Sequence, residues 1–256
     1  MDRSRRALPA LLGAVLLFGC ASAPSPGKTV LLDDSGDTIV VLPLNVTAPM
    51  PERIAPASAL VWKEFEVYLG AHDVPVKTLS FPSARNLWLR SVGLARESAG
   101  PRAGFDDAAR VFADELAKHA EFDTVIVPTL FVQGAQIWGR SARWDGAERP
   151  IDVDEGSWRG QIPEDASYAG AIPAASLHVV VLDANGREVQ QVQAGLDLLT
   201  DIRLLDEPDA FGAPTWEFVD RSAPFANPDH LLEGIARSLA PFLRPLSPEA
   251  VRGKAP

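Results

Sequence analysis

The alternation of apolar and polar positions along the chain predicts strands that alternate with helices. Three β-branched apolar runs have the length and composition of buried strands: residues 38–44, 74–79 and 124–132. Residues 57–69 repeat their apolar positions every three or four residues, as does a segment that begins at Asp106 or Asp107, and this period is typical of amphipathic helices. A further short helix is expected from Ser83 through Leu89. The order strand–helix–strand–helix–strand predicts an α/β sheet.

The C-terminal third of the chain adds a β-hairpin and a last helix. Residues 175–183 alternate between apolar and polar side chains, and Asp-Ala-Asn-Gly at residues 183–186 supplies a turn before a second strand at residues 187–199. Asp229 begins a helix with one apolar stripe, which ends before Pro245. The sequence therefore predicts an α/β fold: a single two-layer domain in which a mixed sheet of about five strands, including this C-terminal hairpin, is packed by three to four helices.

Two long segments of this domain, which spans residues 38–243, lack a sustained hydrophobic period. Irregular loops are therefore expected at residues 133–173 and 203–228, and a loose tail at residues 244–256. The first loop contains three of the six tryptophans, and Trp and Arg are typical anchors at protein interfaces. The candidate partner-binding residues are Trp138, Arg140, Arg143, Trp144, Trp158 and Arg159. The alternative is that the tryptophans fold back into a small satellite core under the loop.

The N-terminus has the pattern of an export signal. Three arginines within the first six residues precede an apolar run at residues 7–18, which is shorter than the roughly 20 residues that a membrane-spanning helix needs. Leu-Phe-Gly-Cys at residues 17–20 resembles the lipobox of bacterial lipoproteins. The resemblance implies cleavage after Gly19, acylation of Cys20 and a tether at residues 20–37. The alternative is an ordinary signal peptide in which the cysteine stands by chance.

The residue after Cys20 bears on the membrane in which the protein is anchored, and the net charge bears on which partners it can bind. Ala21 stands where the inner-membrane retention signal of enterobacterial lipoproteins has Asp, so the resemblance implies the outer membrane, on its periplasmic side. A net charge of −10 without a basic cluster makes nucleic acid and anionic lipid surfaces poor candidates for partners. Because Cys20 is the only cysteine, the fold must hold by packing without a disulfide within the chain.

The motifs of common enzyme classes are missing from the sequence. It contains no G-x-S-x-G, P-loop, G-x-G-x-x-G or H-E-x-x-H pattern, and its four histidines are scattered without metal-like spacing. We therefore predict no catalytic residue, no metal site and no cofactor. The one tight carboxylate group is Asp-Val-Asp-Glu at residues 152–155. Paired carboxylates could act on a sugar, but a solvated acidic turn is the simpler interpretation.

Residues 38–44, the helix that follows them, Val125-Ile126-Val127 and the turn at residues 182–186 together carry a family resemblance. The first strand is similar to the "VAVLPF"-type strand of bacterial envelope lipoproteins that share the N-terminal domain of TolB. This group includes the curli-secretion lipoprotein and the lipoprotein activator of peptidoglycan synthase. The turn resembles the family's L-x-D-x-x-T-G, with Asn185 where Thr is common. The resemblance covers about residues 38–243 apart from the two long loops.

This resemblance implies a non-enzymatic role in assembly, secretion or activation. Secretion members form pores by inserting amphipathic strands, but residues 133–173 have no alternating apolar run, which argues against a pore. We expect a lipid-anchored periplasmic lipoprotein that acts as a protein–protein interaction module in envelope assembly or secretion, with an envelope protein or a second copy of the chain as partner. The alternative is an anchored enzyme or ligand-binding protein that acts on cell-wall or envelope material.

Overall fold

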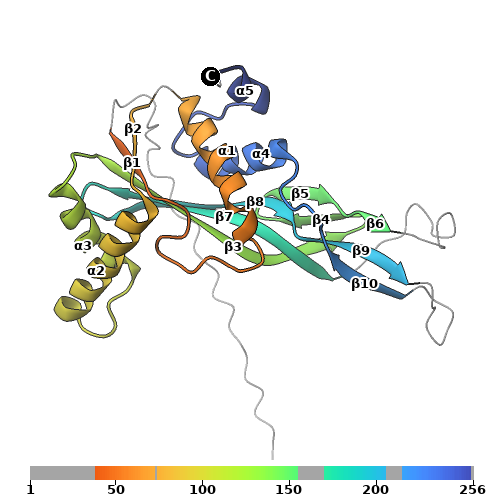
Figure 1. The fold of residues 1–256 in the computed structure, drawn as a ribbon, viewed down its shortest axis with the longest axis horizontal. Coiled ribbons are helices and arrows are strands. Elements are labelled where there is room, and N and C mark those ends of the chain that lie inside the picture. The colour runs from red at the N-terminus through yellow and green to blue at the C-terminus, as the bar shows by residue number, and fades with distance from the viewer. Residues whose placement is uncertain (1–37, 73, 155–169, 206–214, 255–256) are drawn as a thin grey trace, which may run out of the picture.

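A computed structural model describes residues 38–72, 74–154, 170–205 and 215–254 (Figure 1). The predicted lipid-attachment residue Cys20, the tether at residues 20–37, Trp158 and Arg159 lie outside the described residues. In the part of the chain that the structure describes, no helix is both long enough and apolar enough to span a membrane.

Helices and strands account for most of the described residues. The helices are α1 (Ser58–Gly70), preceded by a 3-10 turn (Ala55–Ala57), α2 (Phe81–Ala99), α3 (Phe105–Ala117), α4 (Pro228–Leu239) and α5 (Pro248–Lys254). The strands are β1 (Ile39–Val41), β2 (Val76–Thr78), β3 (Thr124–Trp138), β4 (Ser141–Trp144), β5 (Ala147–Pro150), β6 (Val153–Asp154), β7 (Ala171–Asp183), β8 (Glu188–Leu198), β9 (Thr200–Leu205) and β10 (Thr215–Asp220).

The main sheet is mixed. β1 lies between β2 and β3 and is parallel to both, so that Val41 pairs with Thr78 on one side and Ile126 on the other. β3 is antiparallel to β7, and β7 forms a hairpin with β8 through the predicted turn, where Gly186 has a φ of 71°. β4 and β5 extend the sheet from the far end of β3. The predicted α/β fold with a mixed sheet and a C-terminal hairpin is confirmed, and the described sheet has seven strands.

β1 is buried on both faces, which explains its unbroken run of apolar residues. Ile39 and Val41 belong to a core with α1 and α4, whereas Val40 and Leu42 belong to a core with α2 and α3. Figure 1 shows these two pairs of helices on opposite sides of the sheet. We call this part of the molecule the body; it comprises residues 38–132, 175–199 and 221–254.

The rest of the described chain forms an arm, which extends from the body in Figure 1. The arm comprises residues 133–154, 170–174, 200–205 and 215–220. It is built from the far ends of β3 and β7 with β4 and β5, and from a second sheet in the order β10-β9-β6. A third core, which includes Ile137, Trp144, Ile172 and Ile202, lies among these strands.

The two predicted long loops are wrong. Residues 133–173 contain the end of β3, the strands β4, β5 and β6, and the start of β7, while residues 203–228 contain the second half of β9 and all of β10. The buried positions of β4 and β5 include Ala142 and Arg149. A small or a charged residue thus stands where a large apolar residue would have revealed the strand period.

The helix that follows β2 is longer than predicted. It begins at Phe81 because Ser80 is its N-cap, whose Oγ accepts a hydrogen bond from the backbone N–H of Ser83 (3.3 Å). It continues to Ala99, well past the expected end at Leu89. The exposed Gly93 lowers helix propensity but does not interrupt the helix, whose buried face packs against α3.

The predicted loose tail at residues 244–256 is also wrong, since residues 248–254 form α5. Val251 of this helix is fully buried in the core that contains α1 and α4. Lys254 Nζ donates a hydrogen bond to the backbone oxygen of Ala71 at 2.9 Å. Arg252 of α5 also forms an ion pair with Asp229 of α4, and the backbone N–H of Leu246 donates to the hydroxyl of Tyr68 at 3.4 Å. Burial of Val251 and these long-range contacts therefore hold a segment whose composition resembles a tail.

Candidate functional site

The connections between the parallel strands create a crevice at the carboxyl end of β1. α1 links β1 to β2 across one face of the sheet, and α2 with α3 links β2 to β3 across the other face. Ligands of open α/β sheets bind outside the carboxyl ends of the strands, where such connections diverge. A groove of about 660 Å³ lies at this place. We call it the switch groove; its lining comes from the chain after β1, from α1 and from the junction of β2 with α2.

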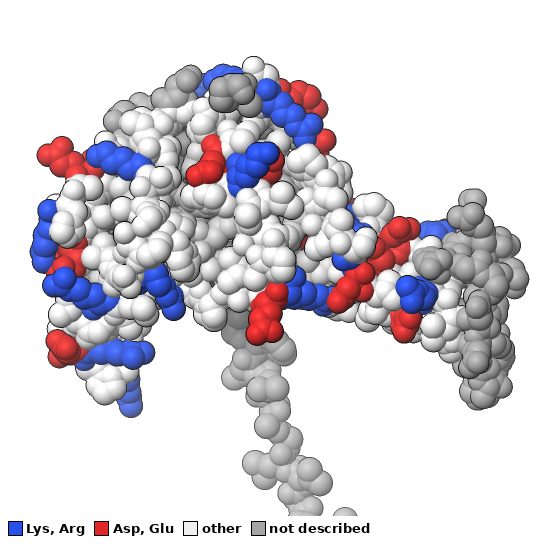
Figure 2. All heavy atoms as spheres, in the orientation of Figure 1, with Lys and Arg blue, Asp and Glu red and all other residues white. Residues whose placement is uncertain are grey.

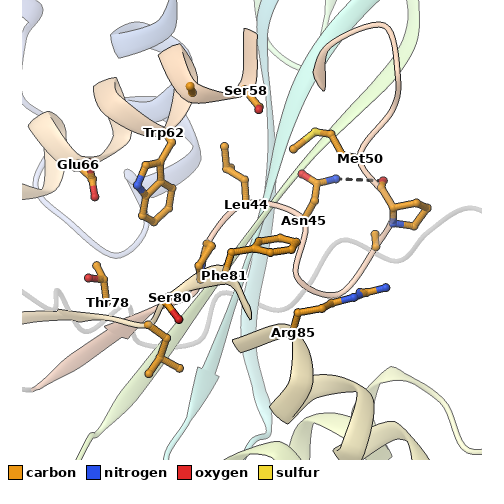
Figure 3. A pocket seen from close by; sticks show the side chains of 15 residues that line it. Leu44, Asn45, Met50, Ser58, Trp62, Glu66, Thr78, Ser80, Phe81 and Arg85 are labelled. Carbon is orange, nitrogen blue, oxygen red and sulfur yellow. Dashed lines mark hydrogen bonds between the residues drawn. The ribbon is translucent and has the colours of Figure 1, made fainter. Parts of the chain in front are cut away.

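The lining of the switch groove is mainly apolar. Figure 3 shows Trp62 on α1 and Phe81 at the start of α2, with Leu44 between them in this view and Met50 beyond. The indole ring of Trp62 stacks on the ring of the fully buried Phe65, with the ring centroids 5.9 Å apart. Phe81 is 48% exposed. One wall of the groove is thus fixed to the core, while the aromatic ring on the opposite wall is open to solvent.

Asn45 fixes the chain that follows β1. It has a φ of 59°, a left-handed conformation that Asn tolerates better than most residues. Its Oδ1 accepts from the N–H of Leu130 and its Nδ2 donates to the oxygen of Leu130, both at 2.9 Å. Nδ2 also donates to the oxygen of Pro49 at 3.2 Å, the bond dashed in Figure 3. The side chain therefore acts as a strand partner for β3 and holds one wall of the switch groove in place.

Three polar side chains of the switch groove form hydrogen bonds with the backbone of the chain itself. Ser58 Oγ donates to the oxygen of Ala55, and Ser80 Oγ caps α2. Arg85 donates from Nη1 to the oxygen of Val46. Glu66 and Arg85 are the charged residues of the lining, which includes neither histidine nor cysteine. Such a lining suits apolar side chains of a bound segment, with a few polar groups at the rim to orient it.

The structure separates the predicted partner-binding tryptophans. Trp138, at the end of β3, is 67% exposed, and the guanidinium of Arg143 lies 5.7 Å from its ring centroid in a cation–π contact. Arg143 also pairs with Glu148 at 3.0 Å. The exposed Arg140 follows in the turn between β3 and β4. These residues lie on the outer surface of the arm.

Trp144, in contrast, is a core residue. It is buried, and its Nε1 donates to the backbone oxygen of Ala175 at 3.1 Å. A Cβ placed on Gly195 would lie 2.6 Å from this nitrogen, so the indole packs directly against the β8 backbone. The assignment of Trp144 to an exposed partner surface is therefore corrected, because the strand alternation of β4 turns it inward while Arg143 turns outward.

A network of ion pairs joins the arm to the body. The buried Asp197 accepts from Arg221 Nη1 at 3.1 Å and from the backbone N–H of Phe225 at 2.9 Å, and Arg221 also pairs with Asp201 at 2.7 Å. Phe225 has a φ of 64°, an uncommon conformation for a bulky residue. The network therefore holds a strained turn between β10 and α4.

A second part of the network surrounds α4. The buried Arg149 of β5 pairs with Glu233 at 2.9 Å, and His230 Nδ1 lies 3.8 Å from Asp197 Oδ1. Burial and the Arg149 guanidinium lower the pKa of His230. Burial raises the pKa of Glu233 and Arg149 lowers it, and the pKa of Glu233 is lowered overall. The ion pair of Arg149 with Glu233 connects β5 to α4, and His230 of α4 lies next to Asp197 of β8, so these residues have a structural role.

The acidic group at residues 152–155 differs from the predicted turn. Val153 and Asp154 form β6, which is parallel to β9, and the backbone N–H of the preceding Asp152 donates to Asp201 Oδ1 at 3.2 Å. Glu155 lies outside the described residues. Over the described part of the chain, no group of three His, Cys, Asp or Glu side chains is placed to hold a metal ion.

No protein-family model matches the chain, and neither a curated protein nor a solved structure matches it. The resemblance to the TolB-type lipoproteins and the lipid-anchored location at the outer membrane therefore remain predictions.

Proposed function

We propose that the chain is a lipid-anchored lipoprotein on the periplasmic side of the outer membrane and acts as a non-enzymatic protein–protein interaction module. In this proposal, the switch groove binds apolar side chains of an extended segment of an envelope protein. The anchor is Cys20, and the tether at residues 20–37 could reach up to about 60 Å if fully extended. Such a tether lets the domain approach partners away from the membrane surface.

The switch groove is the observation that carries this proposal. Its solvent-exposed Phe81 and its fixed Trp62 line a concave apolar site at the place where this topology binds ligands. Full burial of a phenylalanine side chain stabilises by about 1.5–3 kcal/mol, so covering the exposed half of Phe81 would contribute about 1 kcal/mol. Aromatic residues in such pockets are typical hot spots of protein interfaces.

The lining gives less support to the enzyme alternative. General acid–base chemistry needs a titratable group within hydrogen-bond reach of a reacting atom. The two charged residues of the lining are Glu66 and Arg85, and Arg85 is already bound to the backbone of Val46. The hydroxyls of Ser58 and Ser80 are likewise bound within the chain. Arg85, Ser58 and Ser80 thus hold the walls of the groove, and Glu66 is the single carboxylate of the lining.

Photo-cross-linking tests this function. Benzoylphenylalanine replaces Phe81 in the full chain, and cells are irradiated so that the lipidated protein reacts in its native envelope. The matched control carries the same group at Leu89, which lies on the same helix, is 51% exposed and does not line the groove. We expect one discrete protein adduct from position 81, absent from position 89 and weakened by Trp62→Ala. Equal adducts from both positions, or none from position 81, would contradict the proposal.

The anchor is tested separately. Cys20→Ser removes the thiol that acylation requires, so radiolabelled palmitate should no longer enter the protein. The wild-type protein should fractionate with outer-membrane markers. Persistent labelling of the variant would refute Cys20 as the anchor, and fractionation of the wild type with the inner membrane would refute its location at the outer membrane. Neither result bears on the switch groove.

A further inference from the structure

β10 is an edge strand. It pairs antiparallel with β9 over all six of its residues, and in the order β10-β9-β6 no described strand covers its other side (Figure 1). An unpaired strand edge presents N–H and C=O groups on which a further strand can form. Natural edges are commonly blunted by charged side chains, Lys above all, or by Pro. Residues 215–220 (Thr-Trp-Glu-Phe-Val-Asp) contain neither Lys nor Pro, and their two charged residues are both acidic.

Two aromatic side chains lie at this edge. Trp216 is 39% and Phe218 41% exposed, and their ring centroids are 5.0 Å apart. They stand opposite Leu204 and Ile202 of β9, so they share the face that is buried in the core of the arm. The apolar face of the small sheet thus continues to its open edge, where the two rings remain half uncovered.

The acidic residues of β10 are paired within the chain. Glu217 forms an ion pair with Arg203 of β9 at 3.4 Å, and Asp220 forms one with Arg53. Figure 2 shows acidic and basic side chains next to each other along the arm. Two copies of a chain with a net charge of −10 therefore meet little local repulsion at this edge.

We propose that two copies of the chain dimerise by antiparallel pairing of their β10 strands about a two-fold axis. The same patch then meets itself, as in an isologous interface. An axis through Phe218 places the two Phe218 rings opposite each other and brings each Trp216 diagonally next to the other copy's Phe218. An axis through Glu217 would instead place two carboxylates directly opposite each other, which is destabilising. The result is a continuous sheet, β6-β9-β10-β10-β9-β6.

The register is tested by cysteine cross-linking in a full-length Cys20→Ser background, which contains no other cysteine. An axis through Phe218 places Glu217 of one copy opposite Val219 of the other. Directly opposite residues of an antiparallel pair lie about 4.5–5.5 Å apart between Cα atoms, within the range that a disulfide bridges. Glu217→Cys protein and Val219→Cys protein are oxidised separately and as a mixture. We expect a disulfide-linked dimer in the mixture, and little or none from either variant alone.

The association itself is tested by sedimentation equilibrium of the purified full chain in detergent. The mass should rise toward that of a dimer with concentration. Phe218→Lys should raise the dissociation constant at least tenfold, whereas Val189→Lys on the exposed side of β8 (64% exposed) should leave it unchanged. Circular dichroism melting shows that both variants are folded.

Three results would overturn the proposal. The first is that the wild-type protein stays monomeric at the highest concentration. This result counts against the dimer even if β10 is then found to bind a different protein. The second is cross-linking of Glu217→Cys to itself, which would require another register. The third is an equal response of Phe218→Lys and Val189→Lys, which would place the contact elsewhere.

Discussion

The body and the arm share the long strands β3 and β7 but are stabilised differently. In the body, helices cover both faces of β1, and the fully buried side chains include Phe65, Tyr68 and Phe112. In the arm, the core holds one buried tryptophan among alanines and isoleucines. The arm also depends on close backbone approach at Gly195 and on the ion pairs around Asp197. The comparison indicates that burial of large side chains stabilises the body, whereas the arm relies on specific local contacts.

The same contrast separates the two proposed surfaces. The switch groove lies in the body, where strand connectivity forms a crevice with walls fixed by buried neighbours. The β10 edge lies in the arm, where a small sheet ends without a covering element among the described residues. A groove with fixed walls suits a segment of another protein, and an open edge suits a second strand.

The largest expected effect is in the core of the body. Phe112→Ala removes a fully buried ring that contacts Trp88, with the ring centroids 5.9 Å apart, and leaves a cavity under α2 and α3. It should lower the free energy of unfolding by about 3–5 kcal/mol, measured by urea denaturation. Leu89→Ala, at an exposed position of α2, should change it by less than about 1 kcal/mol. Similar losses in both variants would contradict the two-sided core.

The second expected effect connects stability with the switch groove. Asn45→Ala leaves the buried N–H and C=O of Leu130 without their side-chain partner and places alanine at a φ of 59°. These two changes should cost about 2–4 kcal/mol together. Asn45→Gly accepts the left-handed φ but not the hydrogen bonds, so it should lose less stability than alanine. If Asn45→Ala unfolds like the wild type, the side chain does not hold the loop.

The sequence predicted the body better than the arm, for a physical reason. Residues 124–132 and 175–183 are buried by helices or neighbouring strands, and their apolar runs are unmistakable. Only one face of β4 and β5 is buried, and Ala142 and Ala147 on that face are too small to give a strong hydrophobic signal. Pairing with distant partners, such as Trp144 with Ala175, cannot be inferred from local periodicity.

The candidate site was missed for a related reason. Trp62 lies in the predicted helix at residues 57–69, whereas Phe81 precedes the short helix predicted from Ser83. Their common groove depends on two helices lying on opposite faces of the sheet. The predicted order of strands and helices was a usable signal, because it places a crevice at the carboxyl ends of parallel strands. The partner-binding prediction for Trp138 and Arg143 remains compatible with their exposure, whereas Trp144 illustrates the satellite-core alternative.

A third prediction tests the junction of arm and body. Gly195→Ala would bring a methyl group to 2.6 Å from Trp144 Nε1 and 2.7 Å from Ala147 Cβ, so β4 and β5 must shift away from β8. We expect a loss of about 1–3 kcal/mol, with hydrogen-exchange protection reduced first in β4 and β5. Gly93→Ala, in open space on α2, should instead stabilise by about 1 kcal/mol. Equal loss of protection in β1 would mean that arm and body unfold as one unit.

The smallest expected effect is a pH dependence at the same junction. Burial and the Arg149 guanidinium lower the pKa of His230, although Asp197 and Glu233 oppose the shift. The unfolded chain, with a histidine pKa of about 6.5, therefore binds a proton more readily than the folded chain, so stability falls as the pH decreases through this value. His230→Gln should flatten the pH dependence of the free energy of unfolding between about pH 7.5 and 5.5, measured by urea denaturation. His119→Gln, in the exposed turn that follows α3, controls for the loss of a histidine. Parallel pH curves for the wild type and His230→Gln would show that proton binding at this junction is not linked to folding.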